Sequence, residues 1–273
     1  MKVGIIGTGN MGRILIEALM ESSAISPSNL IITNRTIEKA YAIKDQYPEV
    51  NVYTQTSQLI KDSSLIFICV KPLDIFSVLS QYKQYFTRGK CAISITSPIS
   101  VDQLESVLQC SCARVIPSIT NRALSGVSLL SFGKNCDEGW QRLIYEKISS
   151  ISTPVMIEEN ITRVSSDIVS CGPAFFSYLT QRFINGAVEE TGIDQETATI
   201  LASEMLVGLG ELLKKEIYTL PTLQEKVCVK GGITGEGISA LEENLGDVFQ
   251  KLFRATHEKF DEDLEGTRKQ FGR

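Results

Sequence analysis

One glycine-rich stretch near the start of the chain constrains the fold more than any other feature. An apolar run at residues 3–6 is followed by Gly7, Gly9 and Gly12, and then by a helical pattern. This spacing between a strand and a helix is typical of a dinucleotide-binding turn. The first glycine permits the turn, the second lets the backbone approach a pyrophosphate, and the third lets helix and strand pack closely. The alternative is a tight turn without a ligand, and the strand-to-helix context favours the nucleotide.

The predicted pyrophosphate site lies at the N-terminus of the first helix. Unpaired N–H groups and the helix dipole favour negative charge there. We assign five residues of this turn to cofactor binding: Gly7, Gly9, Asn10, Met11 and Gly12.

The N-terminal part of the chain alternates strand-like and helix-like segments. The strand-like runs lie at residues 3–6, 30–33, 51–53, 65–70, 92–95, 113–116, 127–132 and 154–157. Alternation of this kind predicts an α/β fold with a doubly wound, mostly parallel sheet of the Rossmann type. The loops at the carboxyl ends of the strands would then form the ligand site.

Strand-like runs disappear near residue 160, and helical periodicity continues to the end of the chain. We therefore predict a nucleotide-binding domain at residues 1–159 and an all-helical domain at residues 160–273. The polar tail after Lys259 is interpreted as a solvated helix end.

Composition and charge exclude several classes of function. The net charge of −5 provides no basic field for a nucleic acid. The apolar run at residues 65–70 is too short to cross a bilayer, and a strand at residue 3 leaves no room for a signal peptide. We therefore expect a cytoplasmic protein with no nucleic-acid or membrane partner. Seven cysteines without a CxxC pair, and the single His257 in a polar helix, predict no metal site.

The end of the second strand indicates which dinucleotide is bound. An NAD-selective fold carries an acidic residue at this position, whereas this chain has Asn34, Arg35 and Thr36. No carboxylate there repels a 2′-phosphate, and the guanidinium of Arg35 suits one. We therefore predict NADP (NADPH) as the cofactor. The alternative is an ordinary surface arginine.

Several motifs together resemble the pyrroline-5-carboxylate reductase family. In chain order they are Gly7-Thr8-Gly9-Asn10-Met11-Gly12, Asn34-Arg35-Thr36, Val70-Lys71-Pro72, Arg114-Val115-Ile116-Pro117, Cys171-Gly172-Pro173-Ala174 and Gly231-Gly232. The resemblance covers nearly the whole chain. It implies a Rossmann domain followed by an all-helical dimerisation domain, and often larger rings of dimers.

The resemblance also implies an activity and the residues that carry it. The family reduces the cyclic imine 1-pyrroline-5-carboxylate to L-proline with NAD(P)H. Cofactor contacts would include Val70, Lys71 and Pro72. The substrate loop would comprise Val229, Gly231, Gly232, Ile233 and Thr234. The hydroxyl of Thr234, the expected catalytic residue, would hydrogen-bond the ring nitrogen or the carboxylate, and the loop's N–H groups would bind that carboxylate.

The substrate loop departs from the family pattern, which usually reads Thr-Ser-Pro-Gly-Gly-Thr-Thr. Here Val229 replaces the serine, Lys230 the proline and Ile233 a threonine. Such a chain resembles the family's divergent late competence protein ComER branch, to which a regulatory role in sporulation or biofilm development is attributed.

Three hypotheses remain open at this stage. The chain is a working pyrroline-5-carboxylate reductase, an NADP-dependent enzyme on a related imine or carbonyl, or a regulatory protein that kept the fold and lost efficient turnover. A β-hydroxyacid dehydrogenase is set aside, because it needs a catalytic lysine on the helix at residues 174–190, which has none.

Overall fold

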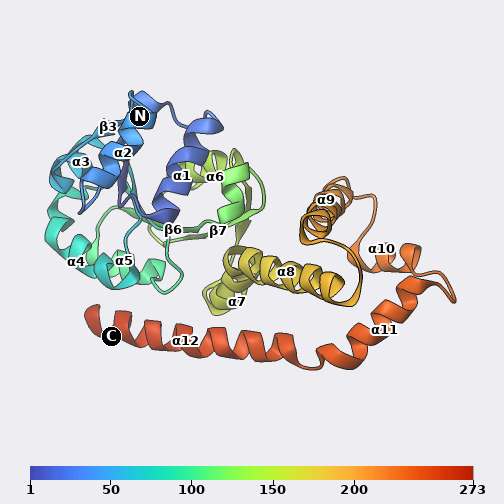
Figure 1. Cartoon of the computed structure of the whole chain (residues 1–273). Helices are drawn as coiled ribbons and strands as arrows, with labels where there is room; N and C mark the ends of the chain where they lie inside the picture. Colours follow the sequence, from blue (N-terminus) through green and yellow to red (C-terminus); the bar gives the residue numbers. More distant parts are fainter. Residues whose placement is uncertain (273) are drawn as a thin grey trace. The chain divides into compact units, whose positions relative to one another are not determined.

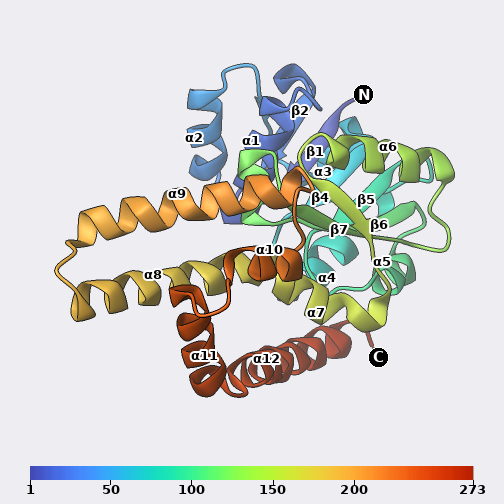
Figure 2. The same cartoon turned by 90° about the vertical axis from the view of Figure 1, so that its right-hand side faces the viewer.

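The computed structural model describes residues 1–272, which form two compact units (Figures 1 and 2). Unit 1 comprises residues 1–173 together with residues 255–272, and unit 2 comprises Ala174–Arg254. These units are not the predicted domains 1–159 and 160–273, whose boundary stays a prediction. Residues 160–173 and the last part of the chain belong to unit 1.

Unit 1 is built on the predicted doubly wound sheet. Its eight strands run in the order β3-β2-β1-β4-β5-β6-β7-β8, and every neighbouring pair is parallel except β6 and β7. The strands are β1 Val3–Ile6, β2 Leu30–Thr33, β3 Asn51–Val52, β4 Leu65–Ile68, β5 Cys91–Ser94, β6 Ser111–Ile116, β7 Val127–Phe132 and β8 Thr153–Met156. The strand order reverses between β1 and β4, and ligands of open α/β sheets bind at such a point.

Helices cover both faces of this sheet. Consecutive residues of β1 separate into two buried clusters, with Ile5 in one and Ile6 in the other, as the alternation of side chains along a strand requires. The first cluster is covered by α1 Asn10–Glu21, α2 Glu38–Gln46 and α6 Glu138–Ser149. The second is covered by α3 Thr56–Asp62, α4 Pro72–Tyr82 and α5 Val101–Val107. Short 3-10 turns lie at Pro27–Asn29, Lys83–Tyr85, Ile119–Ala123 and Glu159–Ile161.

A continuous helical run leads from the sheet into unit 2. It begins with α7 Thr162–Ser166, passes through one π-helical turn at Asp167–Cys171 and becomes α8 Gly172–Glu190. Unit 2 continues with α9 Gln195–Lys214, α10 Leu220–Val227 and α11 Ile233–Leu245. The last helix, α12 Val248–Gln270, starts in unit 2 and ends in unit 1. None of the helices in residues 1–272 is both long and apolar enough to span a membrane.

The end of α12 is not the solvated tail that the sequence predicted. Thr267 is fully buried, and the ring of Phe271 meets that of Phe76 edge-on at 4.9 Å between centroids. Earlier in the same helix, Thr256 Oγ1 donates to Asp167 Oδ2 at 2.8 Å, and His257 Nδ1 lies 3.8 Å from that oxygen. These polar and aromatic contacts attach the end of the chain to the rest of unit 1.

Candidate functional site

The glycine turn after β1 has the geometry that the spacing predicts. Gly7 has φ of +102°, and a Cβ atom there would lie 2.4 Å from the carbonyl oxygen of Cys69. A Cβ at Gly12 would lie 2.2 Å from the oxygen of Gly7, so α1 can only begin this close to the turn with glycine at both positions. Gly9 faces open space and precedes the first residue of α1. The first N–H groups of that helix lack intrahelical partners, so they are available to an anion.

Asn34 fastens the glycine turn to the loop after β2. Its Oδ1 accepts from the backbone N–H of Thr8 at 3.0 Å, and its Nδ2 donates to the carbonyl of Thr36 at 2.8 Å. The side-chain oxygen of Thr8 is buried and has no hydrogen-bond partner in the described chain. A buried hydroxyl without a partner is unfavourable unless a ligand supplies one. This orphaned oxygen at the turn therefore fits a bound phosphate.

Cations gather beside the loop after β2. Arg35 has a side chain that is 88% exposed, and its Nη1 lies 3.9 Å from Asp74 Oδ2. Lys39 lies beside the same loop and lines the cleft described below. It was not singled out from the sequence, although a cation four residues after Arg35 in a helix lies on the same helix face. Two exposed cations beside the hydroxyl of Thr36 suit a 2′-phosphate.

These elements enclose a cleft of about 500 Å³. Of the predicted cofactor residues, the cleft brings together Gly7, Gly9, Asn34, Arg35, Thr36, Val70 and Lys71. Polar side chains that the sequence did not single out complete it: Lys39, Thr54, Thr56, Asp74, Ser77, Gln81 and Tyr82. Burial raises the pKa of the Cys69 thiol, so this lining residue stays protonated and uncharged. The volume and lining fit a dinucleotide, whose assignment to these residues stays a prediction.

The remaining predicted cofactor residues lie around the cleft rather than on its wall. Asn10 is the first residue of α1, and the side chain of Met11 packs against the buried cluster on that face of the sheet. Pro72 begins α4, where its missing N–H costs no helical hydrogen bond. Within residues 1–272 no cluster of His, Cys, Asp and Glu side chains could hold a metal ion.

The predicted substrate loop forms a tight turn before α11 in unit 2. The N–H of Gly232 donates to the carbonyl of Val229 at 2.9 Å, and Gly231 between them has φ of +73°. A positive φ at the third position is the conformation of a type II turn, which favours glycine. Gly232 then serves as the N-cap of α11 without any side-chain cap.

This turn leaves helix N–H groups exposed to a ligand. Ile233 and Thr234 open α11, and the first N–H groups of a helix have no intrahelical acceptor. The side chains of Val229 and Ile233 are 66% and 92% exposed. The turn can therefore receive a carboxylate through its backbone, while two apolar side chains stand where the family pattern has hydroxyls.

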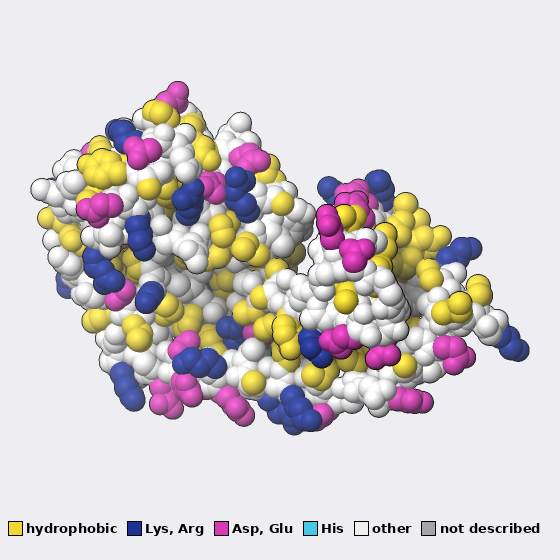
Figure 3. Space-filling model, in the orientation of Figure 1, with side chains coloured by type: hydrophobic (Ala, Val, Ile, Leu, Met, Phe, Trp, Pro, Cys, Tyr) yellow, Lys and Arg dark blue, Asp and Glu magenta, His cyan; other side chains and the backbone are white. Residues whose placement is uncertain are grey.

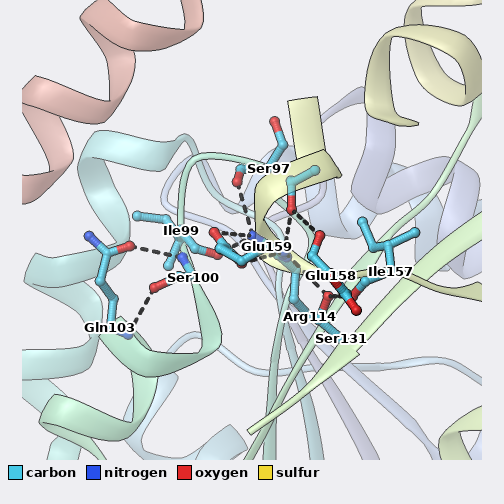
Figure 4. Close-up of polar contacts among 10 residues, drawn as sticks. Ser97, Ile99, Ser100, Gln103, Arg114, Ser131, Ile157, Glu158 and Glu159 are labelled. Carbon is cyan, nitrogen blue, oxygen red and sulfur yellow. Dashed lines mark hydrogen bonds and ion pairs between the residues drawn. The ribbon is translucent and has the colours of Figure 1, made fainter. Parts of the chain in front are cut away.

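A buried arginine on β6 contacts the loop after β5 and the segment that follows β8 (Figure 4). The side chain of Arg114 is fully buried, and its Nη2 donates to Glu159 Oε2 and to Thr162 Oγ1, both at 2.7 Å. Its Nη1 donates to the carbonyl of Ser97 at 3.2 Å. One guanidinium thus links the loop after β5 to the segment that leads into α7. Sequence reasoning used Arg114 only as a family marker and did not predict this role.

Two protein families match the chain, one in the region of β1 to β5 and the other in the helical region that follows β8. Residues 2–98 match NADP oxidoreductase, coenzyme F420-dependent, and residues 159–263 match pyrroline-5-carboxylate reductase dimerisation. The chain is thus built like an NADP-binding oxidoreductase, and the second match supports a homodimer.

Curated relatives and solved structures agree with this assignment. ComE operon protein 4 of Bacillus subtilis is 56% identical over 99% of both chains. Pyrroline-5-carboxylate reductase 3 of the same organism is 28% identical over 95% of this chain and 96% of its own. The fold matches that of Plasmodium falciparum pyrroline carboxylate reductase with NADP bound, with a TM-score of 0.82 at 22% identity over 97% and 98% of the two chains. The chain therefore belongs to the pyrroline-5-carboxylate reductase family, and within it is most like the late competence protein ComER branch.

Proposed function

We propose that this protein is an NADPH-dependent reductase of the pyrroline-5-carboxylate reductase type, which converts 1-pyrroline-5-carboxylate to L-proline. The observation that carries the proposal is the complete dinucleotide cradle of unit 1. It combines the glycine turn at Gly7, the buried unpaired hydroxyl of Thr8 and the cations Arg35 and Lys39. Family membership supplies the substrate class.

The residues divide the work between binding and positioning. Bound NADPH would supply the hydride, and a protonated cyclic imine is already electrophilic at carbon, so the protein has mainly to orient the two. The N-terminus of α1 would hold the pyrophosphate, and Arg35, Thr36 and Lys39 the 2′-phosphate. The N–H groups at Ile233 and Thr234 would bind the substrate carboxylate. The Thr234 hydroxyl would hydrogen-bond the ring nitrogen or that carboxylate.

We also infer a homodimer formed through the helices of unit 2, which family members often extend to larger rings. Large hydrophobic side chains gather on these helices (Figure 3), among them Phe176, Phe183 and Leu201, which are 59–68% exposed. A cytoplasmic location is supported by the cysteines, all of which are free thiols.

The test follows NADPH oxidation with 1-pyrroline-5-carboxylate and, in parallel, NADPH binding by isothermal titration calorimetry. Pyrroline-5-carboxylate reductase 3 of Bacillus subtilis serves as the positive control for the substrate preparation. We expect turnover of at least about 1 s⁻¹, which is ordinary for an enzyme. Tight NADPH binding without turnover would overturn the reductase and favour the alternative below.

The alternative is a ComER-type competence or sporulation regulatory protein that keeps the NADP-binding fold with altered or lost catalysis. The substrate turn favours it, because Val229 and Ile233 present apolar side chains that cannot hydrogen-bond a carboxylate or an imine. Lys230 also takes the place of a proline that would restrict the turn. The structure of the cofactor cleft is compatible with both functions.

Restoring the family residues in this turn separates the two functions further. The double variant Val229→Ser, Ile233→Thr returns both hydroxyls, and we expect kcat/KM for pyrroline-5-carboxylate to rise about tenfold, the gain of one or two hydrogen bonds to a charged group. A matched control, Val227→Ser, adds a hydroxyl at another exposed valine just before the turn. If neither the wild type nor the double variant turns over while both bind NADPH, the regulatory function is supported.

A further inference from the structure

A second pocket adjoins the cofactor cleft and is partly built by the last helix. It has a volume of about 390 Å³ and is lined by Arg35, Lys71, Pro72, Leu73, Asp74 and Asp263. Three of these residues, Arg35, Lys71 and Asp74, also line the cofactor cleft, so the two spaces are neighbours. Asp263 is the contribution of α12 and lies far from the others in the sequence.

Contacts on the end of α12 fix Asp263 in this position. Gln270 Nε2 donates to the carbonyl of Leu73 at 3.0 Å, and Leu73 Cδ2 would lie 3.2 Å from a Cβ at Gly266. The edge-on contact of Phe271 with Phe76 joins the same helix to α4. The helix is therefore packed against the start of α4, which carries Asp74 and directly follows Lys71.

The pocket holds the carboxylates of Asp74 and Asp263 together with the cations Arg35 and Lys71, and Arg35 is part of the predicted 2′-phosphate site. Asp74 already pairs with Arg35 at 3.9 Å, and both side chains are well exposed. Asp263 Oδ1 lies 3.1 Å from Lys259, but Lys259 is shared with Glu262 at 2.9 Å, so this group of three keeps a net negative charge. A 2′-phosphate that binds Arg35 competes with Asp74 and enters a space that Asp263 also lines. Repulsion by these carboxylates lowers the affinity for NADPH but not for NADH, which lacks the 2′-phosphate.

We propose that Asp263, supplied by α12, acts with Asp74 as a selectivity element of the cofactor site that lowers the preference for NADPH over NADH. This inference rests on the proposed NADP cofactor and concerns binding alone. Arg35 attracts the phosphate, and the two carboxylates oppose it. The last turns of α12 thereby belong to the cofactor site, although the same helix begins in unit 2.

The experiment measures Kd for NADPH and for NADH by calorimetry on the full-length protein. We expect Asp263→Asn to tighten NADPH about threefold to tenfold and to change NADH less than twofold, as removal of one nearby, partly screened charge predicts. Asp74→Asn should act in the same direction. The matched control is Glu265→Gln, which removes a carboxylate of the same helix that pairs with Lys269 and does not line the pocket. We expect it to leave both affinities unchanged.

A second readout separates an electrostatic effect from a structural one. The increase in NADPH affinity caused by Asp263→Asn should be smaller in 0.5 M salt, because screening weakens the repulsion in the wild type. The inference would be overturned if the wild type binds NADPH but Asp263→Asn leaves the ratio of the NADPH and NADH affinities unchanged. That result would leave the reductase proposal intact. If pyrroline-5-carboxylate is not turned over but Asp263→Asn raises the affinity for NADPH relative to NADH, the reductase proposal is overturned and this inference stands. Failure of the folded protein to bind either nucleotide would overturn both.

Discussion

The two units of this chain bury their hydrophobic residues to very different extents. In unit 1 both faces of the sheet carry extensive clusters of fully buried aliphatic side chains. Among the described residues of unit 2, the buried hydrophobic side chains are Ile184, Ala198 and Ala202. Large hydrophobic residues of its helices remain exposed instead. Since burial of apolar area is the main driving force of folding, unit 1 can be stable as a single chain, whereas unit 2 needs further surface to cover it.

This difference assigns distinct roles to the predicted cofactor cleft and to the predicted substrate turn. The cofactor cleft lies in the unit with a complete core, where Gly7, Asn34 and Lys71 are held by the sheet and its loops. The substrate turn at Gly231 lies in the unit whose core is incomplete within one chain. We therefore expect cofactor binding to survive loss of the dimer, and substrate use to depend on it.

The largest effect is expected from Phe183→Glu, which places a charge on an exposed aromatic position of α8. Phe183 is 68% exposed in the single chain, and a charge there must be buried if the helix face is covered in a dimer. We expect the dimer Kd, measured by sedimentation velocity, to rise at least about 100-fold, the loss typical of a central aromatic contact. Hydrogen exchange should then show lost protection in unit 2 and retained protection in unit 1.

Tyr41→Glu provides the matched control for that comparison. Tyr41 is an aromatic residue of α2 that is 44% exposed on unit 1. We expect no change in its dimer Kd. A dimer that survives Phe183→Glu, or unit 1 amides that lose protection together with those of unit 2, would contradict the division of stability drawn above.

The second largest effect tests the interior of unit 1 through Arg114. Replacement by methionine keeps most of the volume but leaves the carbonyl of Ser97 and the hydroxyl of Thr162 without their donor. We expect a loss of about 3 kcal/mol, because removal of one partner from a buried charged network strands the others. The thermal midpoint at fixed protein concentration should fall by about 6–12 °C.

Glu159→Gln removes the opposite charge of the same pair as a control. Its side chain is 57% exposed, so solvent already screens the interaction. We expect a loss below about 1 kcal/mol. Equal losses in the two variants would show that the exposed ion pair, rather than the buried hydrogen bonds, holds the loop after β5.

Local rules predicted the cofactor turn but not the contacts that support it. The spacing of Gly7 and Gly12 encodes a backbone shape that few other sequences can adopt, so it is readable within a dozen residues. The eight strand-like runs were also confirmed, most readily at β1, β2, β4 and β5, because these buried parallel strands are largely apolar. The side chains that meet Arg114 lie 45 and 48 residues further along the chain. No local pattern records such a pairing.

The packing of the end of α12 against the rest of unit 1 was not predicted, for a related reason. Its sequence is dominated by charges, and helical periodicity alone does not reveal which of them face another element. Thr267 and Phe271 carry the attachment, but isolated apolar residues in a polar helix are normal on a surface. The presence of Asp263 in the same pocket as Arg35 follows from that attachment, and no sequence pattern indicated it.

The smallest effect is expected from Phe271→Ala, which loosens this attachment without touching the pocket. Loss of the edge-on contact with Phe76 should cost about 1 kcal/mol or slightly more and increase hydrogen exchange in the last turns of α12. Lys269→Ala, at an exposed position of the same turn, is the control. If α12 must be docked for Asp263 to oppose the 2′-phosphate, Phe271→Ala should itself tighten NADPH, and Asp263→Asn should add less in that background than in the wild type. Fully additive effects would mean that Asp263 acts through the general charge of the helix. The attachment of α12 through Phe271 would then not be required for the effect of Asp263 on the choice of cofactor.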